Sequence, residues 1–240
     1  MLKRYAFLVG STKGNTSLPA AREDLILMGK YLMSNVGGGW EKNELRICLN
    51  HSAFDILDRV DWVKRQHPDY FLFYWSGHGY ANDQSQMLKP SGEEAVALEC
   101  FHDVAYRQLM ILDTCREYTR SLPSVMEASF TQAVSIDSQR QRCRRVYDHY
   151  IAECEPSLQI AYACQAGGKA KARRHGGSLF TTTLVDRALR WELPSRRRYG
   201  FASIRRLMGK PFSNGEHPGY YHSGSGVKTR CFPFAVGAYC

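Results

Sequence analysis

Hydrophobic and polar positions along the chain follow two alternating patterns, short apolar runs and longer amphipathic segments. Apolar residues at close to helical spacing predict a helix within residues 18–36. Ser52 is a suitable N-cap for a second helix over 53–66, and Ser178 for a third helix that runs through Trp191. The alternation predicts an α/β protein with a mainly parallel sheet covered on both faces by helices. The apolar runs, each of the length of a buried strand, cover residues 5–10, 44–49, 70–76, 109–112 and 158–164.

Three segments depart from this alternation. Apolar residues on both sides of a turn at 90–92 predict a hairpin beside the main sheet. Residues 118–157 carry no strong strand signal, and we expect a long, partly helical excursion with a basic loop over 139–145. One late strand is expected within 229–236. No internal repeat and no linker divides the chain, so we expect a single domain over residues 1–240.

Composition narrows the class of protein. The 240 residues are 44% apolar, which is enough for a sizeable core, and no run of 18 apolar residues predicts a membrane span. The N-terminal residues enter a strand pattern directly, without the apolar stretch of a signal peptide. The eight cysteines are scattered and form no CxxC pair, which favours free thiols over disulfides or a zinc site. We therefore expect a cytoplasmic protein with no membrane partner.

The net charge of +9 admits two interpretations. It is typical of a nucleic-acid-binding surface, but it also arises from solvated loops. The basic residues are concentrated in three segments that we expect to be loops, which are 140–145, 169–174 and 196–198.

Two reactive side chains stand where two of the apolar strands end. His78 follows the run over 70–76 and lies between two glycines, and Cys115 follows the run over 109–112. Ligands of open α/β sheets bind beyond the carboxyl ends of the strands, so an imidazole and a thiol would meet at one edge. Considered singly, a histidine on a turn or a buried cysteine is more often structural. Together they predict a cysteine nucleophile with its base, and hence a cysteine protease.

Three short motifs support a family resemblance. Ser76-Gly77-His78-Gly79 resembles the Ser-Gly-His-Gly motif of the caspase-like cysteine peptidases, and Asp113-Thr114-Cys115 resembles the Asp-Ser-Cys motif of their metacaspase branch. Residues 18–24 resemble the segment in which that family places a substrate-binding acid, here Asp24. The resemblance covers about residues 1–190 in layout and implies a three-layer α/β/α sandwich around about six strands.

The resemblance also implies a role for each matched residue. Cys115 would be the nucleophile and His78 the acid and base, while the N–H groups of Gly79 and Cys115 would form the oxyanion hole. Preorganised donors of this kind stabilise the negative charge that develops on the substrate carbonyl. The chain continues after the nucleophile as Arg116-Glu117, which differs from the usual family sequence, so the loop there is expected to have another shape.

Substrate selectivity follows from the acidic residues. Asp113 stands where caspases that bind aspartate carry a glutamine, and Leu18 stands where they carry an arginine. The carboxylates of Asp113 and Asp24, with Ser76 beside them, would repel an acidic side chain and pair with a guanidinium or ammonium group. We therefore predict cleavage after Arg or Lys. The alternative for Asp24 is a solvated carboxylate in the first turn of a helix.

Two further predictions concern processing and cofactors. A protease that prefers basic residues would find sites in its own basic loop, so we expect self-cleavage there, against the alternative of a merely exposed charged loop. The candidate sites are Arg140, Arg142, Arg144 and Arg145. Many metacaspases bind calcium through a dense acidic cluster after the histidine. Residues 81–100 hold only the dispersed acids Asp83, Glu93, Glu94 and Glu99, so we expect no metal and no other cofactor.

The expected partners are protein or peptide substrates, and family analogy adds a regulatory protein. The competing hypothesis is a catalytically silent module that keeps the fold and binds nucleic acid or a protein through its basic loops. We favour the peptidase over nucleic-acid binding because both His78 and Cys115 are present.

Overall fold

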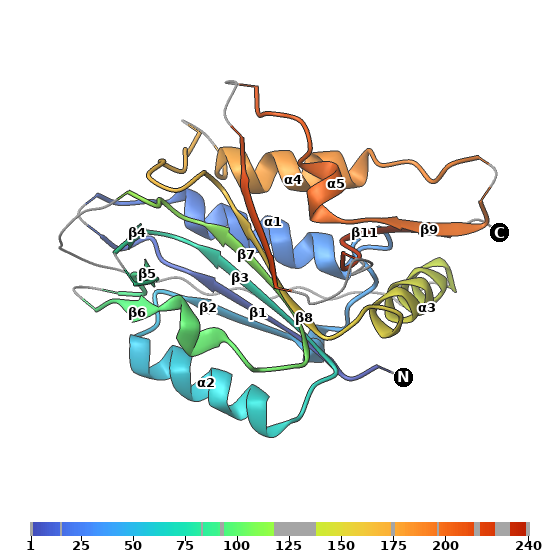
Figure 1. The fold of residues 1–240 in the computed structure, drawn as a ribbon, viewed down its shortest axis with the longest axis horizontal. Helices are drawn as coiled ribbons and strands as arrows, with labels where there is room; N and C mark the ends of the chain where they lie inside the picture. Colours follow the sequence, from blue (N-terminus) through green and yellow to red (C-terminus); the bar gives the residue numbers. More distant parts are fainter. Residues whose placement is uncertain are drawn as a thin grey trace.

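The computed structural model describes residues 2–14, 16–82, 84–91, 94–117, 138–173, 176–195, 197–213, 217–223 and 231–238. Six strands form the central sheet in the order β10-β8-β7-β3-β1-β2, with β10 antiparallel and the others parallel (Figure 1). They are β1 (Arg4–Gly10), β2 (Leu45–Leu49), β3 (Tyr70–Ser76), β7 (Arg107–Asp113), β8 (Ser157–Tyr162) and β10 (Gly219–Ser223).

Helices and two small sheets surround this sheet. The helices are α1 (Ala20–Met33), α2 (Ala53–Arg65), α3 (Ser138–Ala152), α4 (Leu179–Leu189) and the short α5 (Ile204–Leu207), with 3-10 turns η1 (Lys42–Glu44) and η2 (Leu98–Phe101). The small sheets consist of β4 (Gly79–Ala81), β5 (Gln86–Leu88) and β6 (Val96–Ala97), and of β9 (Tyr199–Ala202) paired with β11 (Ala235–Ala238).

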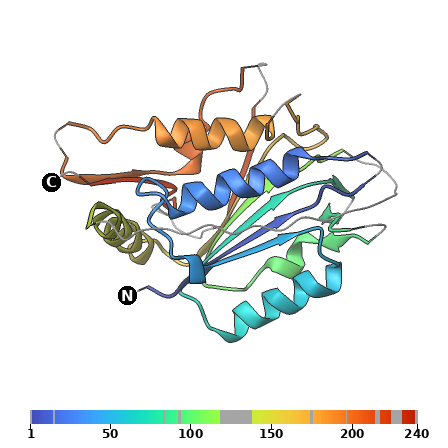
Figure 2. The ribbon, with the colours of Figure 1, turned by 180° about the vertical axis from the view of Figure 1, so that it is seen from behind.

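The helices cover both faces of the central sheet. Figures 1 and 2 show α1 and α4 on one face and α2 on the other. Along β3 the side chains alternate between these two cores: Tyr70, Leu72 and Tyr74 face the α1/α4 side, and Phe71, Phe73 and Trp75 face the α2 side. A strand buried on both faces has no polar positions, which explains the unbroken apolar run in the sequence. The predicted three-layer α/β/α fold with a mainly parallel, six-stranded sheet is therefore confirmed.

Helix starts and the hairpin agree with the sequence pattern. Ser52 and Ser178 cap α2 and α4, each accepting a hydrogen bond from the N–H of the third residue beyond it. The predicted hairpin is present as β5 and β6. Because β4 also pairs with β5, the chain after β3 is held in a three-stranded sheet. That sheet positions the residues that follow His78.

The predicted basic loop over 139–145 is wrong, because these residues belong to α3. Arg144 is buried and pairs with Glu44 at 2.6–2.7 Å, and Arg140 donates to the carbonyl oxygens of Met33 and Trp40. These contacts anchor the helix to the loop after α1. The rest of the excursion, residues 118–137, lies outside the described residues.

The C-terminal part contains the predicted late strand and two strands, β9 and β10, that the pattern did not predict. The late strand, β11, begins at Ala235 and pairs with β9 in a separate sheet. The sixth strand of the central sheet is β10, which pairs with β8. All cysteines in the described part of the chain are free. No helix among the described residues is long and apolar enough to span a membrane.

Candidate active site

The pairing of β3 with β7 brings the two reactive residues to one edge of the sheet. The strands are parallel, Ser76 lies opposite Asp113, and the Gly77 N–H donates to the Asp113 carbonyl at 3.2 Å. His78 and Cys115 each follow two residues beyond this last matched pair. They therefore leave the sheet at the same level, on adjacent strands.

The loops that follow the two strands also run side by side. The buried Gln86 side chain donates from Nε2 to the carbonyls of Tyr80 and Cys115, both at 3.1 Å. The Ala81 N–H donates to the Glu117 carbonyl at 3.0 Å. Gly79 approaches the cysteine loop so closely that a Cβ at this position would overlap the side chain of Thr114. Glycine is therefore required where the two loops meet.

The His78 ring is oriented by the loop after β1. Its Nε2 lies 2.8 Å from the carbonyl oxygen of Thr16, which can only accept a hydrogen bond. Nε2 therefore carries a proton in this arrangement, and Nδ1 is the basic nitrogen of the neutral ring. The backbone of Gly14 packs against the ring, because a Cβ there would overlap the imidazole. Both contacts, with the Thr16 carbonyl and with Gly14, are made by the backbone, so the sequence pattern does not predict them.

Cys115 is a partly buried thiol in the resting structure. Burial raises the pKa of this thiol, and the carboxylates of Glu117 and Asp113 raise it further. The Ala170 backbone and the charge of Lys169 lower the pKa but do not reverse the shift. Its Sγ donates weakly to the carbonyl oxygen of Ala170 at 3.9 Å. The Cys115 N–H donates to no acceptor among the described residues. Cys115 is thus a thiol in this structure, and its backbone N–H is available as a donor.

Two buried carboxylates lie below this edge of the sheet. Asp24 is on α1 and Asp113 ends β7, and their residues are only 0% and 4% exposed. Asp24 accepts hydrogen bonds from Ser76 Oγ and from the Ser178 N–H, both at 2.8 Å. Asp113 accepts from the Ser178 hydroxyl and from the Thr181 hydroxyl, the latter at 2.6 Å. Asp24, Asp113 and Ser76, which the sequence placed together, do lie together.

The N-terminus of α4 connects the two carboxylates, because Ser178 donates to both. Burial, and then the charge of Asp113, raise the pKa of Asp24 to about 7, and burial raises the pKa of Asp113. Among the described residues, no lysine or arginine forms an ion pair with either carboxylate. The alternative prediction that Asp24 is a solvated carboxylate is therefore wrong, because this residue is buried. Within the described part of the chain, the pair is therefore a buried acidic site without a counter-charge.

A single loop closes over both the thiol and the carboxylates. Its described residues include Ala170, beside Cys115, and Gly177, whose Cα lies so close to Asp24 that a Cβ would overlap the carboxylate. The Leu179 N–H donates to the Lys171 carbonyl at 2.8 Å, which holds the two ends of the loop together. In this conformation the anionic site is covered.

Two acids that were considered for calcium have structural partners instead. Glu94 accepts from the Ala53 N–H at 2.9 Å at the start of α2, and Glu99 accepts from the Ser85 hydroxyl. No group of three or more His, Cys, Asp or Glu residues suited to hold a metal ion occurs within the described residues. Asp83 and Glu93 lie outside them.

A six-stranded α/β/α sandwich, with a histidine and a cysteine at the ends of neighbouring strands, defines the caspase-like class of proteins. A family model described as the caspase domain, Peptidase C14, matches residues 3–198. The chain therefore belongs to the caspase domain family, a family of cysteine peptidases.

A solved structure agrees with this assignment at the level of the fold. The crystal structure of caspase-1 from Spodoptera frugiperda matches with a TM-score of 0.58 and 11% sequence identity, over 97% of this chain and 91% of that one. No curated protein matches the sequence.

Proposed function

We propose that this protein is an endopeptidase that cleaves after arginine or lysine through a Cys115–His78 dyad, as in the metacaspase branch. The observation that carries the proposal is the buried Asp24–Asp113 pair, which has no cation among the described residues. Asp113 is the last residue of β7, the strand that leads to Cys115. Burying carboxylates without a counter-charge costs free energy. A substrate guanidinium would supply the missing charge.

The dyad would act in two stages. His78 takes the thiol proton, and the thiolate attacks the carbonyl carbon of the peptide bond that follows the basic residue. The N–H groups of Gly79 and Cys115 stabilise the oxyanion, and His78 returns the proton to the leaving amine. Water, deprotonated by His78, then attacks the thioester carbonyl. The C–S bond breaks, the acid product leaves, and the Cys115 thiolate takes the proton back from His78. The Thr16 carbonyl fixes the tautomer that lets Nδ1 act as the base.

Substrate binding would require the loop around Ala170 and Gly177 to move. Carboxylates that are 0% and 4% exposed cannot receive a guanidinium from solvent. A shift of this loop would open the path to Asp24 and remove the Ala170 carbonyl from the thiol. A regulatory protein partner could act by stabilising the open loop, in a protein that we expect to be cytoplasmic.

The test is a set of fluorogenic tetrapeptides that differ only at the residue before the scissile bond. We expect kcat/KM for Arg and Lys to exceed that for Asp by about 100-fold, equivalent to about 2.7 kcal/mol of differential binding. Cys115→Ala should reduce cleavage to background. The exposed Cys100 gives a matched control, and Cys100→Ala should retain wild-type activity. A preference for Asp, or full activity in Cys115→Ala, would contradict the proposal.

Self-cleavage after the four predicted arginines is harder to reconcile with the structure. A peptidase binds its substrate in an extended conformation, and all four arginines lie within α3. Cleavage there would require the helix to unwind and, at Arg144, the ion pair with Glu44 to break.

A further inference from the structure

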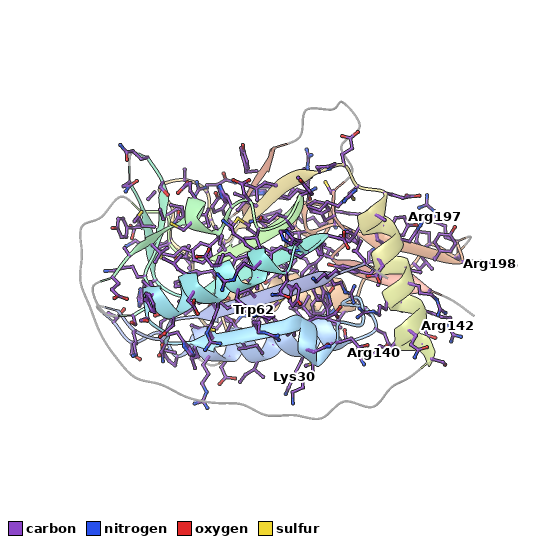
Figure 3. All side chains as sticks on the ribbon, turned by 90° about the horizontal axis from the view of Figure 1, so that it is seen from below. Lys30, Trp62, Arg140, Arg142, Arg197 and Arg198 are labelled. Atoms are coloured by element: carbon purple, nitrogen blue, oxygen red, sulfur yellow. The ribbon has the colours of Figure 1, made fainter. Side chains whose placement is uncertain are left out.

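A basic and aromatic surface lies on α3 and the start of β9. It surrounds a shallow hollow of about 430 Å³, which we call the basic hollow. Figure 3 shows Arg142 on α3, with Arg197 and Arg198 near the same end of the molecule, whereas Lys30 lies elsewhere on α1. The residues that line the hollow are Arg142, Arg145, Val146, His149, Arg198, Tyr199 and Ala238.

The basic hollow has an excess of positive charge. Arg145 and Arg198 are exposed, and their guanidinium groups form no hydrogen bond or ion pair with any described residue. Arg142 donates to Gln139 at 3.0 Å. No carboxylate is among the lining residues. Glu153 lies outside the lining, and its carboxylate is 3.3 Å from His149 Nε2. The hollow is therefore suited to a ligand with more than one negative charge.

Aromatic rings lie beside these charges. Tyr199 is 52% exposed, and its ring centroid lies 6.4 Å from those of both His149 and Tyr150. The Tyr150 ring in turn packs on Phe201 at 4.4 Å. Tyr199 is thus a supported ring with about half of its surface open to solvent. Proteins that bind single-stranded nucleic acids often combine arginine clusters with exposed aromatic rings, because phosphates pair with arginine and bases stack on the rings.

The basic hollow lies at the opposite end of the molecule from the candidate active site. Tyr147 of α3 packs against Tyr70, at the amino end of β3, whereas His78 follows the carboxyl end of that strand. Seven residues of strand separate the two ends by roughly 20 Å. A ligand bound in the hollow would therefore leave the peptide-binding edge accessible.

We infer that the basic hollow binds single-stranded nucleic acid, with Arg145 and Arg198 on phosphates and Tyr199 stacked on a base. An acidic polypeptide would satisfy the arginines but would leave the exposed tyrosine ring without a stacking partner. The inference does not depend on the proposed peptidase activity, because none of these residues belongs to the candidate active site.

The test measures the binding of a fluorescein-labelled 15-residue oligothymidylate by anisotropy, from 50 to 300 mM NaCl. Arg145→Glu combined with Arg198→Glu should weaken binding at least tenfold and reduce the log–log salt slope by at least about 1.4, for two lost phosphate contacts. Lys30→Glu combined with Arg65→Glu is the matched control, since both residues are exposed and the net charge changes equally. The control should bind within about threefold of wild type.

Three further comparisons decide the chemistry of the ligand. An abasic strand of equal length should bind the wild type more weakly than oligothymidylate, and Tyr199→Ala should remove that difference. Poly-glutamate that binds as tightly as the oligonucleotide would overturn the inference in favour of an acidic protein. Equal losses in the two double variants, or no oligonucleotide binding at 50 mM NaCl, would also overturn it. Unchanged thermal unfolding of each variant confirms that it is folded.

Discussion

Asp24 shows at the scale of one residue how a buried carboxyl group can oppose stability. Burial and the charge of Asp113 raise its pKa to about 7, so the native protein holds this proton more tightly than the unfolded chain does. Stability from this group is therefore lost as pH rises from about 4 through about 7. Above pH 7, the native state must carry the charge of Asp24 beside a second buried acid, Asp113.

Asp24→Asn should therefore stabilise the protein at pH 8, by at least about 1 kcal/mol in the free energy of unfolding measured with urea. The asparagine oxygen can still accept from the Ser178 N–H, and its amide can donate to Ser76 Oγ. The same variant should lose selectivity for Arg peptides. Asp186→Asn, at an exposed carboxylate paired with Arg190, is the control and should change stability little. A destabilised Asp24→Asn at pH 8 would contradict the assignment of an uncompensated charge.

The sequence predicted the reactive side chains better than their supports. His78, Cys115, Asp24 and Asp113 stand at strand ends or at an expected helix start, where side-chain chemistry and pattern coincide. The Thr16 carbonyl that orients the imidazole is a backbone group, so any residue type could provide it. Ser178 was foreseen as a helix cap, but its bridge between two carboxylates depends on the packing of α4 against α1, which is a tertiary feature.

At the scale of elements, α3 explains why a basic segment can be misjudged from sequence. Its arginine-rich pattern is typical of a solvated loop, yet Arg144 is buried against Glu44, and Glu44 also lies 3.4 Å from Arg4. Tyr147 and Ile151 supply the apolar face of the helix. The strand β10 was not predicted because a short antiparallel strand at the edge of a sheet lacks the long apolar run of a central strand.

Adjacent arginines on α3 give a direct test of this anchoring. Arg144→Gln should destabilise the protein by on the order of 2 kcal/mol, because Glu44 would lose its closest partner while Arg4 still faces it. Arg145→Gln should change stability by less than about 0.5 kcal/mol, since that side chain is exposed and has no described partner. Urea unfolding of both variants checks the difference, and equal stabilities would show that the buried pair does not anchor α3.

At the scale of the whole molecule, shared packing connects the parts of the chain. One hydrophobic core joins the central sheet to α1, α3, α4, β9 and β11, and a second joins the other sheet face to α2 and η2. The sheet strands β1, β3 and β7 contribute side chains to both cores. The expectation of a single domain over residues 1–240 therefore predicts one cooperative unfolding transition.

Tryptophan fluorescence and far-ultraviolet circular dichroism should give superimposable urea unfolding curves. The four tryptophans report on different regions: Trp40 lies beside α3, Trp62 is on α2, Trp75 is in β3, and Trp191 follows α4. Independent unfolding of any of these regions would separate the two curves. Separated midpoints would mean that the chain contains more than one folding unit.

The proposed specificity is tested most directly with irreversible thiol-directed peptides that carry either arginine or aspartate before the reactive ketone. Because the arginine side chain would compensate the Asp24–Asp113 pair, the arginine reagent should alkylate Cys115 in preference to the other cysteines, as located by mass spectrometry, and the aspartate reagent should not. Equal labelling by both reagents, or labelling of another cysteine with Cys115 unmodified, would contradict the central claim.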